Sequence, residues 1–182
     1  MKITVYCSSK SNLDNKYTST AVELGRWIGS NKHELVYGGV NAGMMHILAQ
    51  SAHDAGASIT GIIPECFTSR ADELNDTLET TPGLNERKAR MYALADAFVV
   101  LPGGLGTIDE WVSTLSALVV DCDTRRKIIV VNIDGIFDDM AAQLNRVAAS
   151  PFARNSTMDQ CYVIVDSITN MINELNNIKN CK

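Results

Sequence analysis

A glycine-rich turn that leads into a helix is the first stretch of this sequence that could do chemistry. Residues 97–101 are apolar and β-branched, and a Pro-Gly pair follows them, which predicts a buried strand. Glycines let the backbone approach a ligand closely, and the free N–H groups at a helix start attract anions. Gly103, Gly104, Gly106 and Thr107 therefore predict a phosphate site, with an ordinary tight turn as the alternative.

A capping pattern lies at the start of the predicted helix. Thr107 and Glu110 form a Thr-x-x-Glu capping box before the apolar run over residues 111–119, so the helix is predicted to open at Thr107. Asp109 is predicted to complement the dipole at that helix start. Two roles are therefore open for Glu110: a structural one, as part of the helix cap, and a chemical one, as a carboxylate.

A run of charged residues begins the preceding helix, which is predicted over residues 84–95. Glu86, Arg87 and Lys88 are typical of a solvated helix face. Arg87 also carries a fixed charge and several donors, which suit phosphate binding or transition-state stabilisation. From the residues alone, the solvated face is the favoured interpretation.

Strand and helix patterns alternate along the whole chain and place these residues. Strands are predicted at residues 3–7, 35–37, 58–63, 78–81, 97–101, 127–133 and 161–165, with helices at 17–30, 43–55, 84–95, 107–120, 136–149 and 166–178. Strands that are apolar throughout predict an α/β fold, a Rossmann-like parallel sheet flanked by helices on both faces. Gly38 and Gly39 follow one strand as Gly103 and Gly104 follow another, so both pairs are predicted to face one cleft. Residues 68–76 are predicted to form a mobile loop.

The overall composition limits the class of protein. The 182 residues predict a single domain, residues 1–182, with a substantial core, and the net charge of -5 argues against a nucleic-acid partner. No apolar run reaches membrane-spanning length, and no export signal is evident, so a cytoplasmic protein is predicted. Neither a disulfide framework nor a metal site is expected, because the chain has three histidines and five scattered cysteines: Cys7, Cys66, Cys122, Cys161 and Cys181.

These motifs, taken in order, resemble the Lonely Guy (LOG) family of nucleoside 5′-monophosphate phosphoribohydrolases. The family signature PGGxGTxxE is met by residues 102–110, and a second signature, an Arg-Lys pair followed by Met, is met by residues 86–91. Weaker matches occur at residues 5–9, 36–39, 61–64, 96–98 and 135–137. The resemblance therefore covers essentially the whole chain.

The resemblance implies hydrolysis of the N-glycosidic bond between an adenine-type base and ribose 5-phosphate, with no cofactor or metal. Such a reaction builds positive charge on the ribose. Glu110 is the matched catalytic carboxylate, able to stabilise that charge and to orient or deprotonate water, and Arg87 is the matched catalytic cation. The implied substrate-binding residues are those of the glycine turn together with Ser8, Gly38, Gly39, Gly43 and Lys88. A homodimer acting on a small nucleoside monophosphate is also implied.

Two departures from the family pattern matter most, beside the mild change of the usual Met before the Arg-Lys pair to Leu84. The family usually has GGGxxGLMG where this chain has residues 38–46, so Val40 and His46 replace two glycines. We expect a narrower or reshaped pocket around the nucleotide. The alternative function is a nucleotide-binding or molybdenum-cofactor carrier protein of the same fold. Glu110 and Arg87 favour the enzyme, whereas Val40 and His46 favour the carrier.

Overall fold

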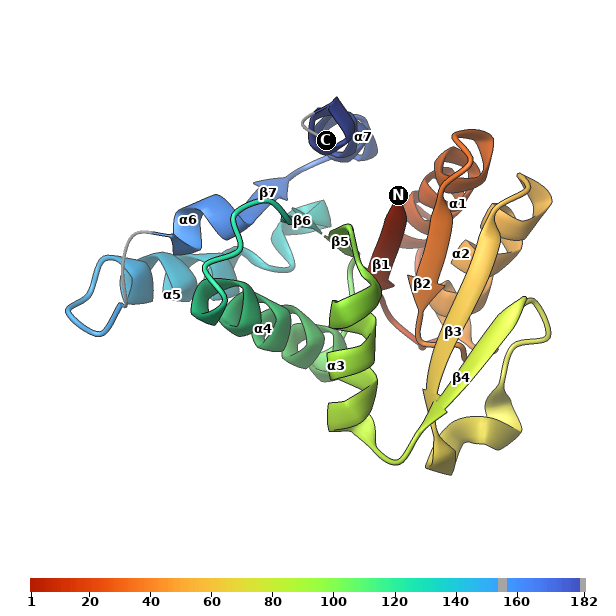
Figure 1. Ribbon diagram of the computed structural model, residues 1–182. Helices are drawn as coiled ribbons and strands as arrows, with labels where there is room; N and C mark the ends of the chain where they lie inside the picture. The colour runs from red at the N-terminus through yellow and green to blue at the C-terminus, as the bar shows by residue number, and fades with distance from the viewer. Residues whose placement is uncertain (154–156, 181–182) are drawn as a thin grey trace.

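Seven parallel strands form one sheet in the order β4-β3-β2-β1-β5-β6-β7 (Figure 1). The computed structural model describes residues 1–153 and 157–180. The predicted α/β, Rossmann-like parallel sheet is confirmed. The strands span Lys2–Tyr6 (β1), Glu34–Tyr37 (β2), Ser58–Pro64 (β3), Thr77–Thr81 (β4), Ala97–Val100 (β5), Ile128–Val131 (β6) and Tyr162–Val165 (β7).

Helices cover both faces of the sheet, as predicted (Figure 1). One face carries α1 (Asn15–Ser30), α2 (Gly43–Asp54) and α7 (Ile168–Asn180). The other carries α3 (Leu84–Leu94), α4 (Leu105–Val120), α5 (Asp138–Ala148) and α6 (Met158–Cys161). Successive strand residues point to opposite cores, so Val5 packs on the first face and Tyr6 on the second. This is why the strands are apolar throughout.

The strand order reverses direction at β1. The chain runs outward from β1 through β2 and β3 to β4, and then returns to β5 on the other side of β1. The crossovers diverge at such a point, and this leaves a crevice at the carboxyl ends of the two central strands. The loops that follow β1 and β5 therefore line the same crevice.

The start of α4 differs from the sequence-based prediction. The helix begins at Leu105 with Gly104 as its N-cap, two residues before the expected start at Thr107. The predicted capping box is wrong, because Thr107 and Glu110 both lie inside the helix and are buried. Asp109 is likewise beyond the first turn, so its predicted role at the helix dipole is wrong as well. The glycine turn lets the backbone enter the helix without a side-chain cap.

Other elements depart from the prediction in smaller ways. A 3-10 helix, η1 (Glu65–Arg70), occupies part of the segment predicted as a mobile loop, and a second, η2 (Ile133–Gly135), follows β6. The short α6 was not predicted, because four residues are too few for a helical period. Four cysteines are free thiols, namely Cys7, Cys66, Cys122 and Cys161, and Cys181 lies outside the described residues. Within the described ranges, no helix is both long and apolar enough to cross a membrane.

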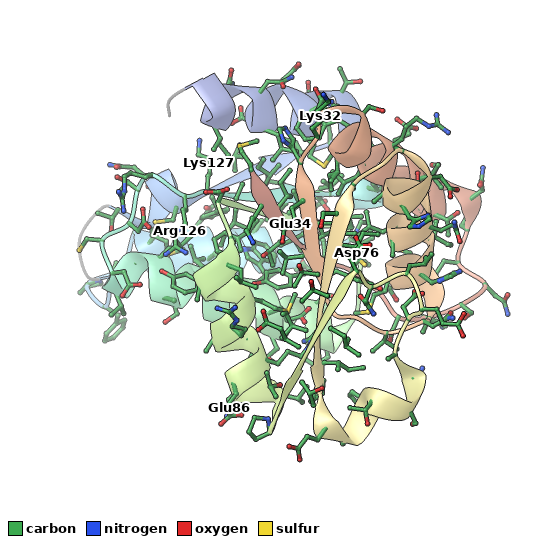
Figure 2. All side chains as sticks on the ribbon, turned by 45° about the vertical axis from the view of Figure 1, so that its right-hand side comes forward. Lys32, Glu34, Asp76, Glu86, Arg126 and Lys127 are labelled. Atoms are coloured by element: carbon green, nitrogen blue, oxygen red, sulfur yellow. The ribbon has the colours of Figure 1, made fainter. Side chains whose placement is uncertain are left out.

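Charged side chains lie at both ends of the sheet (Figure 2). Lys32 and Lys127 precede β2 and β6 at the amino ends of the strands, whereas Glu86 lies near the start of α3 at the opposite end. Ion pairs occupy the amino end, where Glu34 bonds Lys2 at 3.0 Å and Lys127 lies 3.7 Å from Glu174. The glycine turns lie at the carboxyl end.

Candidate active site

A cavity of about 560 Å³ opens at the carboxyl ends of the central strands. Its walls come from the loop after β1, the ends of β2 and β3, the start of α3 and the turn between β5 and α4. This volume is within the range of small-molecule sites. Eight of the predicted site residues line it: Ser8, Gly38, Arg87, Gly103, Gly104, Gly106, Thr107 and Glu110.

The amino-terminal end of α4 forms one end of this cavity. Gly104 is the N-cap with an extended backbone, and a Cβ added there, or at Gly106, would meet nothing within 4 Å. At Gly103, by contrast, an added Cβ would collide with the side chain of Thr107. α4 has 16 residues and no acidic side chain in its first turn, so its free N–H groups are available to an external anion. This geometry suits a phosphate.

A buried ion pair lies in the wall beside this helix start. Arg87 Nη1 donates to Glu110 Oε1 at 2.5 Å, and Arg87 Nε donates to the Ile62 carbonyl oxygen at 2.9 Å. Arg87 is 7% exposed and Glu110 6% exposed, although both line the cavity. The interpretation of Arg87 as part of a solvated helix face is therefore wrong. Arg87 and Met91 are the buried face of α3 and point toward the sheet.

Burial also changes the acid–base chemistry of the carboxylate. Desolvation raises the pKa of Glu110 above its ordinary value of 4.5, and the positive charge of Arg87 opposes that shift. A charged carboxylate in this position faces the cavity from a low-dielectric wall, where it acts strongly on a nearby cation. The cavity thus combines a helix start that suits an anion with a carboxylate able to stabilise positive charge.

Lys88 is not among the residues that line the cavity. Its Nζ bonds both carboxylate oxygens of Asp109, at 2.9 and 2.8 Å, and the hydroxyl of Ser113 at 3.2 Å. Lys88 follows Arg87 on α3 and Asp109 precedes Glu110 on α4. The two helices are therefore joined by two adjacent ion pairs, of which only Arg87–Glu110 faces the cavity.

Two predicted glycines shape the cavity without lining it. Gly39 has a positive φ of +70°, and an added Cβ would lie 3.2 Å from the Gly61 Cα. Gly43 has a φ of +51° and packs against the backbone of Lys10, where any Cβ would collide. Both glycines are therefore needed by the turn that follows β2.

The two departures from the family pattern lie in different environments. Val40 lines the cavity and bridges to Ala71 on the segment after η1. His46 does not line it, and its Nδ1 lies 2.8 Å from the buried Asp72 carboxylate. Of the two residues expected near the nucleotide, Val40 alone lines the cavity.

Sequence analysis missed several residues of the cavity wall, among them Lys10, Phe67 and Arg70. Lys10 belongs to the loop after β1, and the other two belong to η1, which directly follows β3. Their position after the carboxyl ends of predicted strands was the available signal. Isolated basic and aromatic residues in loops are otherwise too common to single out.

Comparison with known proteins adds independent evidence on the family. A family model described as "Possible lysine decarboxylase" matches residues 45–175. The cytokinin riboside 5′-monophosphate phosphoribohydrolase LOG of Oryza sativa subsp. japonica is 31% identical over 153 residues. That match covers 83% of this chain and 63% of the rice protein, so the chain spans less than two thirds of it. The cytokinin riboside 5′-monophosphate phosphoribohydrolase of Rhodococcoides fascians is 30% identical over 167 residues, which cover 90% of this chain and 84% of that protein.

Solved structures share the fold at lower identity. The molybdenum cofactor binding protein of Rippkaea orientalis superposes with a TM-score of 0.75 at 23% identity, over 97% of this chain and 96% of that one. The molybdenum cofactor carrier protein of Chlamydomonas reinhardtii gives a TM-score of 0.74 at 18% identity, over 98% of each chain. At these identities the likeness concerns the fold alone. The family model and the two sequence relatives carry the assignment further: the chain belongs to the Lonely Guy (LOG) family.

Proposed function

We propose that this protein hydrolyses the N-glycosidic bond of adenosine 5′-monophosphate or an N6-substituted relative. The products are the free base and ribose 5-phosphate. The observation that carries the proposal is the buried Arg87–Glu110 pair in the wall of the cavity, next to the start of α4. The names of the rice and Rhodococcoides fascians relatives support the same reaction.

The arrangement suggests a role for each group. The N–H groups at the start of α4, with the Thr107 hydroxyl, hold the 5′-phosphate. As the bond to the base breaks, Glu110 stabilises the cationic ribose and orients or deprotonates the attacking water. Arg87 holds the Glu110 carboxylate in place through Nη1 while its Nε is fixed on Ile62. Water adds its hydroxyl to the sugar carbon and its proton goes to the departing base.

A panel of nucleotides tests the proposal directly. The protein is incubated with nucleoside 5′-monophosphates and the matching nucleosides, and free base and ribose 5-phosphate are measured. We expect adenosine 5′-monophosphate to be cleaved and adenosine to remain intact, because only the nucleotide carries the group that α4 binds. Release of no ribose 5-phosphate from any member of the panel contradicts the proposal.

A carrier that binds a nucleotide without turnover is the second candidate. The observation in its favour is Val40, which adds a side chain to the cavity wall where the family has glycine. Tight binding of the panel without release of base favours this candidate.

We also propose that the protein acts as a homodimer. Leu105 is 83% exposed and Leu84 53% exposed, and Leu84 lines the cavity. Both apolar side chains lie at the starts of the helices that carry the ion pair. Light scattering on the protein as it elutes from a sizing column measures its mass. A mass equal to that of one chain contradicts this proposal.

Substitution of the N-cap glycine of α4 tests the phosphate site. Gly104→Ala places a methyl group in the space that an anion must enter, and the protein around it is not disturbed. We expect nucleotide affinity to fall by about tenfold or more, measured by calorimetry, with an unchanged melting temperature. Gly83→Ala is the matched control, because Gly83 is the extended N-cap of α3 and does not line the cavity. Equal affinities for the two variants contradict a phosphate site at α4.

The second ion pair between α3 and α4 gives a further prediction. Lys88→Met removes the bond to Asp109, so the helices lose one of the contacts that align Arg87 with Glu110. Small misplacements of catalytic groups are costly, and we expect kcat to fall by about ten- to a hundredfold with little change in KM.

The control for this prediction comes from the same helix. Arg90 bonds Glu79 with two contacts, at 2.6 and 2.9 Å, but joins α3 to β4 instead of α4. Arg90→Met should therefore leave kcat close to that of the unchanged protein. If Lys88→Met instead raises KM and leaves kcat unchanged, Lys88 binds the substrate directly.

A further inference from the structure

The 3-10 helix η1 presents an aromatic ring and a guanidinium group to the cavity. Phe67 and Arg70 both line it, and they are three residues apart on η1. A 3-10 helix has three residues per turn, so side chains at this spacing share one face. The two side chains therefore form a common surface on the side of the cavity that follows β3.

The backbone on both sides of Arg70 is fixed to the turn after β2. The Arg70 carbonyl accepts from the Asn41 N–H at 2.9 Å, and the Asp72 N–H donates to the Gly39 carbonyl at 2.8 Å. The Asp72 side chain is 1% exposed and its carboxylate lies 2.8 Å from His46 Nδ1. Arg70 thus projects from an anchored segment, and His46 is part of that anchor.

The position of η1 relative to α4 indicates which part of a nucleotide it meets. α4 follows β5 and η1 follows β3, and these strands are separated by β1 and β2. Three strand spacings amount to roughly 14 Å. The Arg87–Glu110 pair lies between them, since Arg87 bonds the end of β3 and Glu110 belongs to α4. With the phosphate at α4 and the ribose at the ion pair, the base extends toward η1.

The guanidinium of Arg70 is available for that base. Among the described side chains, those of residues 1–153 and 157–178, and the described backbone, the Arg70 side chain has no hydrogen-bond or ion-pair partner. A guanidinium only donates hydrogen bonds, so it matches a base edge with acceptors. A 6-oxopurine presents two acceptors, O6 and N7, in the spacing of the guanidinium fork, whereas adenine presents the N6 donor beside N7.

We propose that Arg70 reads the base of the nucleotide and extends the substrate range to 6-oxopurine nucleoside 5′-monophosphates. Phe67 stacks on the ring while Arg70 donates to O6 and N7. This inference rests on the proposed function, because it assumes that the 5′-phosphate of the substrate binds at the start of α4. It makes Arg70 a specificity-determining residue of the same site.

The test compares guanosine and adenosine 5′-monophosphates on the unchanged protein and on Arg70→Met. We expect kcat/KM for guanosine 5′-monophosphate to fall by about tenfold or more, and that for adenosine 5′-monophosphate to fall by a clearly smaller factor, because adenine offers N7 but no O6 acceptor. Arg70→Lys keeps the charge but lacks the fork, so we expect it to lose the guanosine nucleotide as Arg70→Met does. With 7-deazaguanosine 5′-monophosphate, which lacks the N7 acceptor, the effect of the substitution should shrink.

Other results overturn the inference. If Arg70→Met lowers kcat/KM equally for both nucleotides, Arg70 contacts the phosphate or the ribose and not the base. If kcat/KM falls for neither nucleotide, Arg70 does not contact the substrate. If the unchanged protein cleaves neither nucleotide, the proposed hydrolysis fails, and calorimetry then decides about Arg70 separately. The inference is supported if the unchanged protein binds guanosine 5′-monophosphate more tightly than adenosine 5′-monophosphate and Arg70→Met abolishes this preference. It is overturned if each protein binds the two nucleotides with equal affinity.

Discussion

Glu110→Gln should reduce turnover of adenosine 5′-monophosphate by about 10²–10³ while nucleotide binding is retained. The amide has the shape of the carboxylate and still accepts a hydrogen bond from Arg87, whose Nη1 lies 2.5 Å from Glu110 Oε1. It lacks the negative charge that stabilises a cationic ribose and the basicity that takes a proton from water. Single-turnover release of ribose 5-phosphate and calorimetric affinity measure the two effects separately.

The pH dependence of turnover is the control for this variant. Because burial raises the pKa of Glu110 above 4.5, kcat of the unchanged protein should fall with acid at a pH above that value, as the carboxylate takes up a proton. The residual activity of Glu110→Gln should lack this acid limb. Full activity of Glu110→Gln contradicts a catalytic role for Glu110 and makes the ion pair a structural feature.

Arg87→Met should destabilise the protein by about 3–5 kcal/mol in addition to removing its activity. The substitution leaves the Glu110 carboxylate at 6% exposure without the cation that compensates its burial. Chemical denaturation measures the free energy of unfolding of the folded variant. The exposed pair Arg90–Glu79 offers the matched control, because both of its side chains are about a third or more exposed. Arg90→Met breaks this pair and should lower the free energy of unfolding by about 1 kcal/mol or less.

A double variant separates the structural role of the pair from its chemistry. Arg87→Met combined with Glu110→Leu replaces both buried charges by apolar side chains of similar volume, so no uncompensated charge remains. We expect this protein to recover most of the stability that Arg87→Met loses, and to remain inactive in the hydrolysis assay. A double variant as unstable as Arg87→Met shows that the loss does not come from the unpaired carboxylate.

Local sequence patterns were sufficient for the sheet and for one end of the cavity. Apolar runs such as residues 97–101, alternating with amphipathic helices, predict a parallel sheet because only buried strands are apolar on both faces. The spacing of Gly103, Gly104 and Gly106 marks the turn that leads into α4, since neighbours along the chain set its geometry. Helix ends were less predictable: the expected cap at Thr107 is part of α4, because the glycines allow the helix to begin earlier.

The environment of each charged side chain was decided by the tertiary structure. Arg87 and Lys88 are adjacent in the sequence, yet Arg87 is buried against Glu110, 23 residues away, while Lys88 bonds Asp109 outside the cavity. Successive positions on a helix point about 100° apart, and the sequence of α3 does not say which of them faces the sheet. That choice depends on how α3 packs against β3 and α4.

The same limit applies to the segment after β3. Sequence analysis predicted a mobile loop over residues 68–76, and it offered no reason to select Phe67 or Arg70. The structure fixes this segment through Asp72, which meets Gly39 and His46 from other elements. The sequence by itself determined the alternation of strands and helices along the chain and the glycine turn at the start of α4, because both follow from local periodicity and turn chemistry. The buried ion pair and the face of η1 were decided only by tertiary structure, because each requires groups that are distant along the chain to pack together.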